Sequence, residues 1–434
     1  MRTLATALAV LVLGAGPALA KQPAASSLDK VLVIGTDGTR WDLLRDAMRD
    51  GRAPNLARLA RQGFVRSSKL EYAPNVFTLS EVGWSSIASG VWPGKHGVDG
   101  HKFNMDPKQA TKNGYLDFLT RVQRAAPRLD TYLASDWANI GLAQNGGPIF
   151  GATDDRFAVS VDEETLEQWD AGDVRVTNAA KSFLRRGDPD ASFVYLGLVD
   201  ETAHLSGSAT PAYPAAIAST DARIGQLIRA VRNRPSYPFE SWTIIVTTDH
   251  GQLPLDEPSI ASHLTQTPLE ITSFLIGAGP GLSANVKRPK VVDIAPTVLH
   301  QLGLPVRKAW KLDGRTLSRS RGSRVSASVR NGRLSVSLRL AQPRAGARSL
   351  IVRLPGGVRI KSAATVDSHV NGRPVGGTIR GGRTIVIRVP GHRLRSLSVS
   401  AAVTVAAGRG RTLGLALSGA KAARGSLSVK LAGA

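Results

Sequence analysis

The sequence predicts an α/β fold with a mainly parallel, doubly wound sheet that has helices on both faces, followed by a small antiparallel β-sandwich. Over most of the 434 residues, continuous apolar runs of strand length alternate with segments of helical periodicity, which is the pattern of a parallel sheet. Beyond about residue 325, apolar residues recur at every second position, as in antiparallel strands. The composition changes at the same place: residues 321–434 contain 21 Lys and Arg, one acid (Asp367) and no aromatic residue.

The first part of the chain supplies the predicted parallel sheet and its helices. Strands are expected at 30–36, 131–133, 192–199, 242–248 and 273–276. Helical spacing covers 41–62, where Pro54 should divide the segment into two helices. Further helices are expected at 164–184, 215–231 and 291–302, the last ended by Gly303 and Pro305.

The last part of the chain is predicted to form β-hairpins. Period-two runs at 324–329, 333–340, 349–354, 384–389 and 397–400 are separated by turn pairs such as Asn331-Gly332 and Asn371-Gly372. We predict an α/β domain at 28–314, a linker at 315–324 that is rich in Ser and Arg, and a basic β-rich domain at 325–434.

The N-terminus has the form of a secretory signal peptide over residues 1–20. Arg2 precedes a short apolar run at 4–13, and Ala18-Leu19-Ala20 resembles a cleavage site. The run is short for a membrane span. The absence of cysteine excludes disulfides, thiolate metal sites and cysteine nucleophiles. These features predict a secreted or periplasmic bacterial protein without a transmembrane segment after signal cleavage.

Three of the predicted strands lead into an aspartate: Asp37, Asp200 and Asp249. Ligands of an open α/β sheet bind beyond the carboxyl ends of its strands. Carboxylates that converge there repel one another unless a cation neutralises them. Taken singly, each aspartate is equally typical of a turn or a helix N-cap. The three together indicate a metal site.

Histidines accompany these aspartates. His204 follows Asp200 by four residues and would share its helix face, His250 adjoins Asp249, and His263 lies in the loop beyond. A single histidine is more often a surface or core residue, which is how we interpret His300, His369 and His392. Nitrogen and carboxylate ligands without sulfur suit zinc, with manganese or iron as alternatives.

The segment 78–90 contains the candidate nucleophile, Ser80. One interpretation is an ordinary helix start, because Thr78 and Glu81 have capping-box spacing. The other is that Ser80 lies at a helix N-terminus, where the dipole favours a phosphate, and is activated there by a metal or a base. No Gly-x-Ser-x-Gly surrounds Ser80, which argues against a hydrolase triad.

These segments resemble the alkaline phosphatase superfamily and, within it, the type I phosphodiesterase/nucleotide pyrophosphatase branch. The resemblance covers roughly residues 28–306, and its motifs lie in the family's order at 33–38, 80–98, 200–204, 248–251, 268–281 and 292–299. It implies an alkaline phosphatase-like fold and two divalent metal ions. It also implies the ligands: Asp200, His204 and His263 for the first ion, and Asp37, Asp249, His250 and the Ser80 oxygen for the second. In-line attack by Ser80 would form a phosphoseryl intermediate.

The sequence departs from the family pattern at two places. Relatives often have an asparagine about twenty residues after the nucleophile. In this chain His101 stands at that distance from Ser80, and Asn104 is close by. Both are therefore candidate substrate-binding residues. Glu81-Val82 replaces the small residues that are common after the nucleophile, and an acid beside Ser80 favours less anionic substrates such as diesters. Ser80 also lacks the following x-Pro-x-Arg of sulfatases.

We therefore predict an exported, metal-dependent hydrolase of a small-molecule phosphate ester, with phosphodiester or nucleotide pyrophosphate bonds as substrates. The alternatives are a phosphomonoesterase of the same superfamily and a catalytically inert anion-binding surface protein. The basic C-terminal domain is expected either to bind an anionic cell-surface polymer or to be simply a solvated β-domain. Its lack of aromatic residues argues against base stacking and against stacking on sugar rings.

Overall fold

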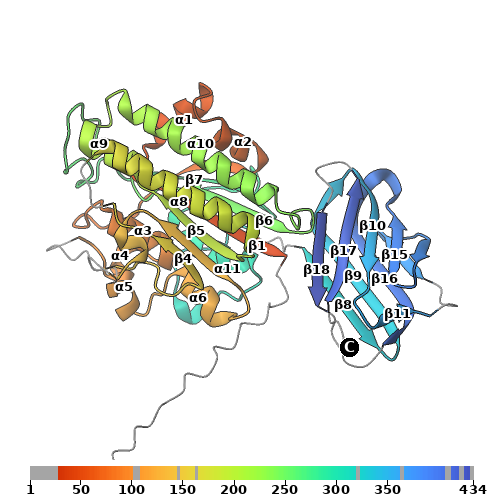
Figure 1. Ribbon diagram of the computed structural model, residues 1–434. Coiled ribbons are helices and arrows are strands. Elements are labelled where there is room, and N and C mark those ends of the chain that lie inside the picture. The colour runs from red at the N-terminus through yellow and green to blue at the C-terminus, as the bar shows by residue number, and fades with distance from the viewer. Residues whose placement is uncertain are drawn as a thin grey trace, which may run out of the picture.

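The computed structural model describes residues 28–100, 108–143, 147–161, 165–318, 323–361, 366–405, 412–419 and 425–430. Figure 1 shows a larger part, in which helices flank a central sheet, beside a smaller part built of strands. This arrangement confirms the predicted fold class. The signal-peptide segment 1–20 lies outside the described residues. Within the described ranges, no helix is long and apolar enough to cross a membrane.

The larger part contains a seven-stranded mixed sheet. Its order is β2 (Phe64–Lys69), β7 (Thr272–Ala278), β6 (Ser241–Thr247), β1 (Asp29–Thr36), β5 (Ala191–Leu196), β3 (Thr131–Ser135) and β4 (Asp155–Ala158). The five strands from β6 to β4 are parallel, whereas β7 is antiparallel to both of its neighbours. β1 therefore lies in the middle of the sheet, between β5 and β6.

Helices cover both faces of this sheet. One face carries α1 (Trp41–Arg49), α2 (Pro54–Gln62), α8 (Leu166–Arg186), α9 (Leu198–Ser206) and α10 (Ala212–Arg232). The other carries α3 (Ser80–Ser89), α6 (Phe118–Ala125) and α11 (Ile294–Gln301). The short helices are α4 (Pro93–His96), α5 (Lys108–Lys112) and α7 (Ala138–Gly141). Along β1, Leu32 and Ile34 enter one core, while Val31 and Val33 enter the other. This alternation of buried residues explains the continuous apolar run in the sequence.

Several predicted boundaries differ from the observed ones. The strand expected at 192–199 ends at Leu196, and Asp200 lies instead in the first turn of α9. The helix expected at 291–302 begins with a 3-10 turn at Val291–Asp293 and continues as α11. The edge strands β2 and β4 were not predicted, because partly exposed strands lack a continuous apolar run. Pro54 does begin a second helix, as expected.

The smaller part consists of two antiparallel sheets. One has the order β13 (Arg373–Pro374), β12 (Asp367–Val370), β16 (Arg393–Val405), β9 (Arg333–Ala345) and β8 (Arg324–Arg330), with β11 (Val358–Ile360) also on β16. The other has the order β14 (Gly377–Arg380), β15 (Thr384–Arg388), β10 (Ala347–Arg353), β17 (Thr412–Gly419) and β18 (Gly425–Lys430). Asn331 and Gly332 both have positive φ, as a tight hairpin turn requires.

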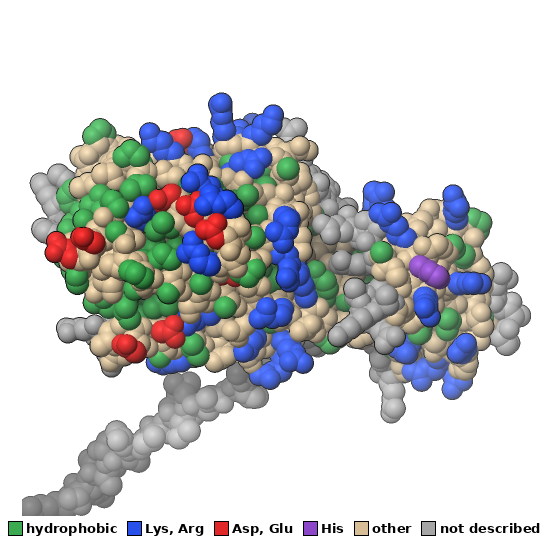
Figure 2. All heavy atoms as spheres, turned by 90° about the horizontal axis from the view of Figure 1, so that it is seen from above, with side chains coloured by type: hydrophobic (Ala, Val, Ile, Leu, Met, Phe, Trp, Pro, Cys, Tyr) green, Lys and Arg blue, Asp and Glu red, His purple; other side chains and the backbone are tan. Residues whose placement is uncertain are grey.

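One apolar core fills the space between these two sheets, and the larger part contributes Leu28 and Phe239 to it. Figure 2 shows Lys and Arg side chains spread over the C-terminal part at the right, whereas acidic side chains gather on the larger part. The expected linker is partly described: Arg315 N–H donates to Asp293 Oδ1, and Leu317 N–H donates to Thr297 Oγ1. The domain boundaries themselves remain a prediction.

Candidate active site

Asp37 follows β1 at the centre of the sheet and is 1% exposed. Its Oδ2 accepts hydrogen bonds from Trp84 Nε1, at 2.9 Å, and from the Tyr195 hydroxyl. Its Oδ1 lies 3.4 Å from Ser80 Oγ and 3.6 Å from His250 Nε2. The aromatic donors thus hold one carboxylate oxygen and leave the other facing the candidate nucleophile.

Asp249 and His250 follow β6, the neighbour of β1 in the sheet. Asp249 Oδ1 accepts a hydrogen bond from Gly38 N–H at 3.2 Å. Asp249 Oδ2 lies 3.2 Å from His250 Nε2 but accepts no hydrogen bond within the described part of the chain. A buried carboxylate oxygen without a donor is costly, and a cation would satisfy it.

Ser80 is the first residue of α3 and is 9% exposed. Its Oγ lies 3.1 Å from His250 Nε2. The capping-box interpretation is wrong, because Leu79 occupies the N-cap position and makes no side-chain cap. Thr78 instead donates its hydroxyl to the Thr265 carbonyl. Among the described residues, no side chain caps the N-terminus of α3, the end of the helix at which Ser80 lies.

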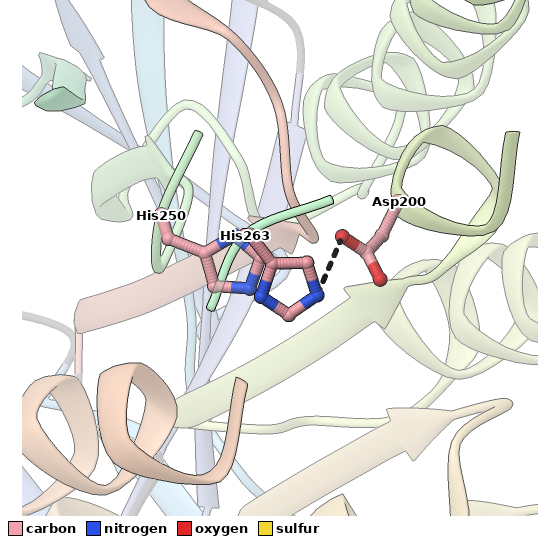
Figure 3. Close-up of side chains that lie close together, drawn as sticks. All are labelled: Asp200, His250 and His263. Atoms are coloured by element: carbon pink, nitrogen blue, oxygen red, sulfur yellow. Dashed lines mark ion pairs between the residues drawn. The ribbon is translucent and has the colours of Figure 1, made fainter. Parts of the chain in front are cut away.

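Asp200, His204 and His263 form a second group beside the first. As expected from their spacing, Asp200 and His204 share a face of α9, with Oδ2 and Nε2 3.1 Å apart. His263, from the loop between β6 and β7, places its Nε2 3.1 Å from His204 Nε2 and 4.0 Å from Asp200 Oδ1. Figure 3 shows His263 facing Asp200 while its ring lies against that of His250, and the two ring centroids are 4.0 Å apart.

The left-handed backbone at Gly38 lets the two groups approach each other. Its φ is +56°, and a Cβ at this position would collide with the Asp200 carboxylate and with Gln252. Only glycine adopts this conformation without a steric cost at such a close approach. Gln252, in turn, donates its side-chain amide to Asp200 Oδ1.

The three histidines are oriented in the same way. Each Nδ1 lies at hydrogen-bonding distance from a backbone carbonyl: 3.0 Å from Ser259 for His204, 2.9 Å from Gly251 for His250, and 2.6 Å from Thr78 for His263. A carbonyl can only accept, so Nδ1 carries the proton and Nε2 keeps a lone pair that faces the carboxylates. Metal-binding histidines are held in this way.

Two sets of ligand atoms are close enough to bind a common ion. Asp37, Asp249 and His250 form one set, and Asp200, His250 and His263 form the other; within each set all ligand atoms lie within 4.8 Å of one another. His250 belongs to both sets, and His204 is within contact distance of Asp200 and His263. All seven predicted metal-site residues, including Ser80, are therefore brought together, and the nitrogen and carboxylate donors fit a divalent cation.

The carboxylates of the site repel one another. Burial and the neighbouring Asp200 raise the pKa of Asp37. Burial and Asp37 raise the pKa of Asp249 well above its usual value. Burial opposes the charged form of Asp200 as well, but His204 and His263 outweigh it and lower the pKa of that carboxyl. Burial and His250 lower the pKa of His263 to about 3. A bound cation would favour the charged carboxylates and the neutral imidazoles.

Sequence reasoning missed several residues that position these ligands. Trp84 lies in the motif around Ser80, but its hydrogen bond to Asp37 was not predicted. Tyr195 lies on β5, and no sequence pattern marked it as a functional residue. Glu81 accepts a hydrogen bond from Asn139 Nδ2 at 3.0 Å, and burial raises the pKa of Glu81 to about 7. The two candidate substrate-binding residues, His101 and Asn104, lie outside the described residues.

Comparison with solved structures finds chains of low sequence identity. Murine ectonucleotide pyrophosphatase/phosphodiesterase 5 is 16% identical, with a TM-score of 0.44, over 65% of this chain and 99% of that chain. A 2-O GAG sulfatase is 12% identical, with a TM-score of 0.46, over 73% of this chain and 81% of that chain. Phosphonoacetate hydrolase from Sinorhizobium meliloti 1021 is 19% identical, with a TM-score of 0.37, over 52% of this chain and 58% of that chain.

Comparison with curated protein sequences gives no match. The family model described as type I phosphodiesterase / nucleotide pyrophosphatase matches residues 31–297, which include Asp37, Ser80, Asp249 and the other candidate ligands. This match covers more than half of the chain. The chain belongs to the type I phosphodiesterase/nucleotide pyrophosphatase family and is a phosphoric ester hydrolase.

Proposed function

We propose that this protein is an exported two-metal phosphodiesterase that cleaves phosphodiester or nucleotide pyrophosphate bonds through a phosphoseryl intermediate on Ser80. The observation that carries the proposal is the position of Ser80 Oγ. It lies at the start of α3, 3.1 Å from His250 Nε2 and 3.4 Å from Asp37 Oδ1, within a group of aspartates and histidines that suits divalent cations.

Asp200, His204 and His263 would hold one ion, and Asp37, Asp249, His250 and Ser80 Oγ would hold the other. Zinc fits these nitrogen and oxygen ligands, and manganese or iron are alternatives. When bound, the ions would neutralise the carboxylates, favour the deprotonated Ser80 hydroxyl and stabilise the leaving oxygen.

The residues of the chain would then carry out the reaction in two steps. Ser80 Oγ, having lost its proton to water, attacks phosphorus; a P–O bond to Ser80 forms while the bond to the leaving oxygen breaks. The N-terminal N–H groups of α3 face the phosphoryl oxygens and favour their negative charge. A water molecule next attacks the phosphoseryl group, which releases the phosphate product and restores the Ser80 hydroxyl.

Substrate preference is proposed to follow from Glu81. This side chain is half-buried and directly follows the nucleophile in the chain. When it is charged, it disfavours a doubly charged monoester more than a singly charged diester. His101 and Asn104 remain candidates for contacts with the phosphate. The export signal at 1–20 and the basic C-terminal domain further support a role outside the cell, with the C-terminal domain as an anchor on an anionic polymer.

The test is hydrolysis of bis-p-nitrophenyl phosphate by the mature protein, by Ser80→Ala and by Ser89→Ala as a matched control. Ser89 lies in the same helix and donates only to the Ser85 carbonyl. Each protein is assayed as purified, after chelation and after zinc is restored. We expect chelation and Ser80→Ala to abolish turnover, zinc to restore the wild-type rate, and Ser89→Ala to remain active. Mass spectrometry after an acid quench should detect a phosphorylated peptide that contains Ser80.

Control substrates separate the alternatives. Preference for the p-nitrophenyl monoester would instead identify a phosphomonoesterase. If the folded, zinc-loaded protein hydrolyses neither of these esters nor nucleotides and aryl sulfates, the anion-binding alternative replaces the catalytic one.

A further inference from the structure

The outward face of the six-stranded C-terminal sheet carries a regular array of hydroxyl groups. Core residues such as Leu334 and Val336 on β9 alternate with outward-facing ones. Strands β8, β9 and β16 place their serines directly opposite one another in two rows. We call this array the serine face; its six members are Ser326, Ser337 and Ser398 in one row and Ser328, Ser335 and Ser400 in the next.

Residues opposite one another on neighbouring strands lie on the same face, about 5 Å apart, and the two rows are about 7 Å apart. The six hydroxyls therefore form a flat grid of donors and acceptors. Among the outward-facing residues of the grid, Ser326, Ser335, Ser337 and Ser398 are exposed. A shallow groove of about 230 Å³ lies over this face and is lined by all six serines and by Asp367.

Arginines flank the serine face along the strands. Arg330 and Arg333 pair at one end of the β8–β9 hairpin, and Arg339 lies on β9 beyond Ser337. All three are exposed. Arg333 Nε donates to Ser400 Oγ at 2.7 Å, so its guanidinium lies at the edge of the hydroxyl grid. Arg333 and Arg339 are six residues apart, about 20 Å along the strand.

The lateral edge of the groove adds an acceptor. Asp367 on β12 lies opposite Ser400, and His369 lies opposite Ser398. The Asp367 carboxylate is 3.4 Å from His369 Nδ1. The groove thus combines cationic donors at its ends, neutral hydroxyls in its middle and one carboxylate at its side.

The other sheet differs on its outward face. Ile351 on β10 and Val386 on β15 lie opposite each other there, both only half-buried. Arg353 and Arg388 are exposed on the same two strands. Basic charge is thus common to both sheets, and the other sheet also has hydroxyls, of which those of Ser349 and Ser418 lie 2.6 Å apart; the groove lined by six serines lies over the six-stranded sheet.

We propose that the serine face binds an acidic polysaccharide that runs along the strands, with its carboxylate or sulfate groups at the flanking arginines and its hydroxyls over the serines. Charge complementarity requires a polyanion. The serine grid and Asp367 favour a chain that presents hydroxyls between its charged groups. Residues 321–434 contain no aromatic side chain, so neither nucleic-acid bases nor sugar rings can stack on this domain, and hydrogen bonds and ion pairs would have to carry the binding. The inference rests on the proposed anchoring role of this domain and not on the phosphoesterase chemistry.

The experiment measures binding of the full-length mature protein to polygalacturonate, with dextran and a short DNA duplex as comparison ligands, between about 50 and 200 mM salt. The first variant, Ser335→Ala/Ser337→Ala/Ser398→Ala, removes hydroxyls without changing charge. The second, Arg333→Gln/Arg339→Gln, is matched by Arg353→Gln/Arg388→Gln, which removes the same charge from the other sheet. Hydrolysis of bis-p-nitrophenyl phosphate and thermal unfolding of each variant show whether fold and catalysis are intact.

We expect polygalacturonate to bind more tightly than DNA or dextran. The triple serine variant should weaken this binding at least about tenfold, because several hydrogen bonds are lost together. Arg333→Gln/Arg339→Gln should weaken it more than Arg353→Gln/Arg388→Gln does. Equal losses in the two arginine variants, or full binding by the serine variant, would overturn the proposal in favour of diffuse charge attraction. Tighter binding of DNA would identify a nucleic-acid surface instead. A protein that is inactive on the diester but still binds in this pattern would contradict only the catalytic proposal.

Discussion

The two oxygens of the Asp37 carboxylate have different neighbours. Trp84 and Tyr195 donate to Oδ2, whereas Oδ1 faces Ser80 and His250. Mutating a residue that orients a metal ligand typically lowers metal affinity or activity by about 10- to 100-fold. The Tyr195 hydroxyl is therefore expected to matter although it touches neither the candidate nucleophile nor the substrate.

Tyr195→Phe removes that hydroxyl and keeps the ring. We expect metal affinity or diester hydrolysis to fall by about 10- to 100-fold, because the carboxylate loses one of its fixed donors. Tyr132→Phe is the control, since this ring stacks on Phe183 away from the site. Metal titration monitored by restored activity measures the effect, and unchanged metal affinity in Tyr195→Phe would contradict the assigned role.

A second buried pair of carboxyls lies outside the candidate metal site. Asp136 follows β3, and Asp173 on α8 accepts a hydrogen bond from Gly197 N–H at 2.9 Å. Both are fully buried. Burial and Asp173 raise the pKa of Asp136, and burial likewise raises the pKa of Asp173. In the folded protein this pair holds protons that the unfolded chain releases.

From these raised pKa values we predict that the free energy of unfolding falls as the pH rises. The fall begins near pH 4, about the ordinary aspartate pKa, and continues through the raised pKa values that Asp136 and Asp173 have in the folded protein. The sign follows because the folded state binds more protons than the unfolded state. Asp136→Asn keeps the shape without the ionisation. It should raise the free energy of unfolding at pH 7 by about 1–3 kcal/mol and leave it nearly unchanged at pH 4.

Denaturant unfolding at several pH values measures the difference, with exposed Asp155→Asn as the control. A destabilised Asp136→Asn at neutral pH would show that the ionised form makes interactions that the structure does not explain.

At the scale of an element, the position of α3 determines where Ser80 lies. Gly83, one turn into the helix, packs against the chain at Asp249: a Cβ on Gly83 would come within 2.6 Å of Asp249 Cβ. Alanine normally stabilises a helix interior relative to glycine. Here the added methyl group would push α3, and Ser80 with it, away from β6.

Gly83→Ala is thus expected to lower kcat/KM for the diester by about 100-fold, since a displacement of about 1 Å is enough for such a loss. Gly94→Ala in α4 is the matched control, because a Cβ there meets no atom within 4 Å. Steady-state kinetics at saturating zinc distinguishes the two. Wild-type activity in Gly83→Ala would mean that α3 does not set the position of the nucleophile.

At the scale of the whole molecule, the two parts of the chain share a core. Phe239, just before β6, is fully buried among the apolar residues of the C-terminal sheets. Hydrogen bonds between Ser323 N–H and Ser241 Oγ, at 2.9 Å, and between Ser426 N–H and the Pro235 carbonyl, at 2.9 Å, cross the same junction. We expect these contacts to couple the unfolding of the two parts.

Phe239→Ala should remove about 3–5 kcal/mol of stability from this junction. We expect calorimetry to resolve two thermal transitions where the wild type has one, while diester hydrolysis at 25 °C is retained, because the active site lies at the opposite, carboxyl end of β6. Phe183→Ala, at a partly buried position packed against the core of the larger part, should lower stability without splitting the transition. A single transition in Phe239→Ala would show that the other contacts suffice for coupling.

The sequence alone identified much of the fold and all of the candidate ligands. Buried parallel strands leave continuous apolar runs, and Asn-Gly pairs mark hairpins, so β1, β6 and the β8–β9 hairpin were predictable. The order of motifs with their aspartates and histidines indicated the metal site, because carboxylates that gather at strand ends repel one another unless a cation neutralises them.

Features that arise from contacts between distant segments of the chain became visible only in the tertiary structure. It ended β5 at Leu196 and began α9 at Leu198, where the sequence predicted a strand up to residue 199, since the apolar run continues from β5 into α9 without a break in composition. It brought Tyr195 and Trp84 to Asp37 and aligned serines from three strands into one face. Such contacts depend on strand order, register and the packing of helices on the sheet, and a sequence pattern records periodicity along the chain but not which segments become neighbours in space.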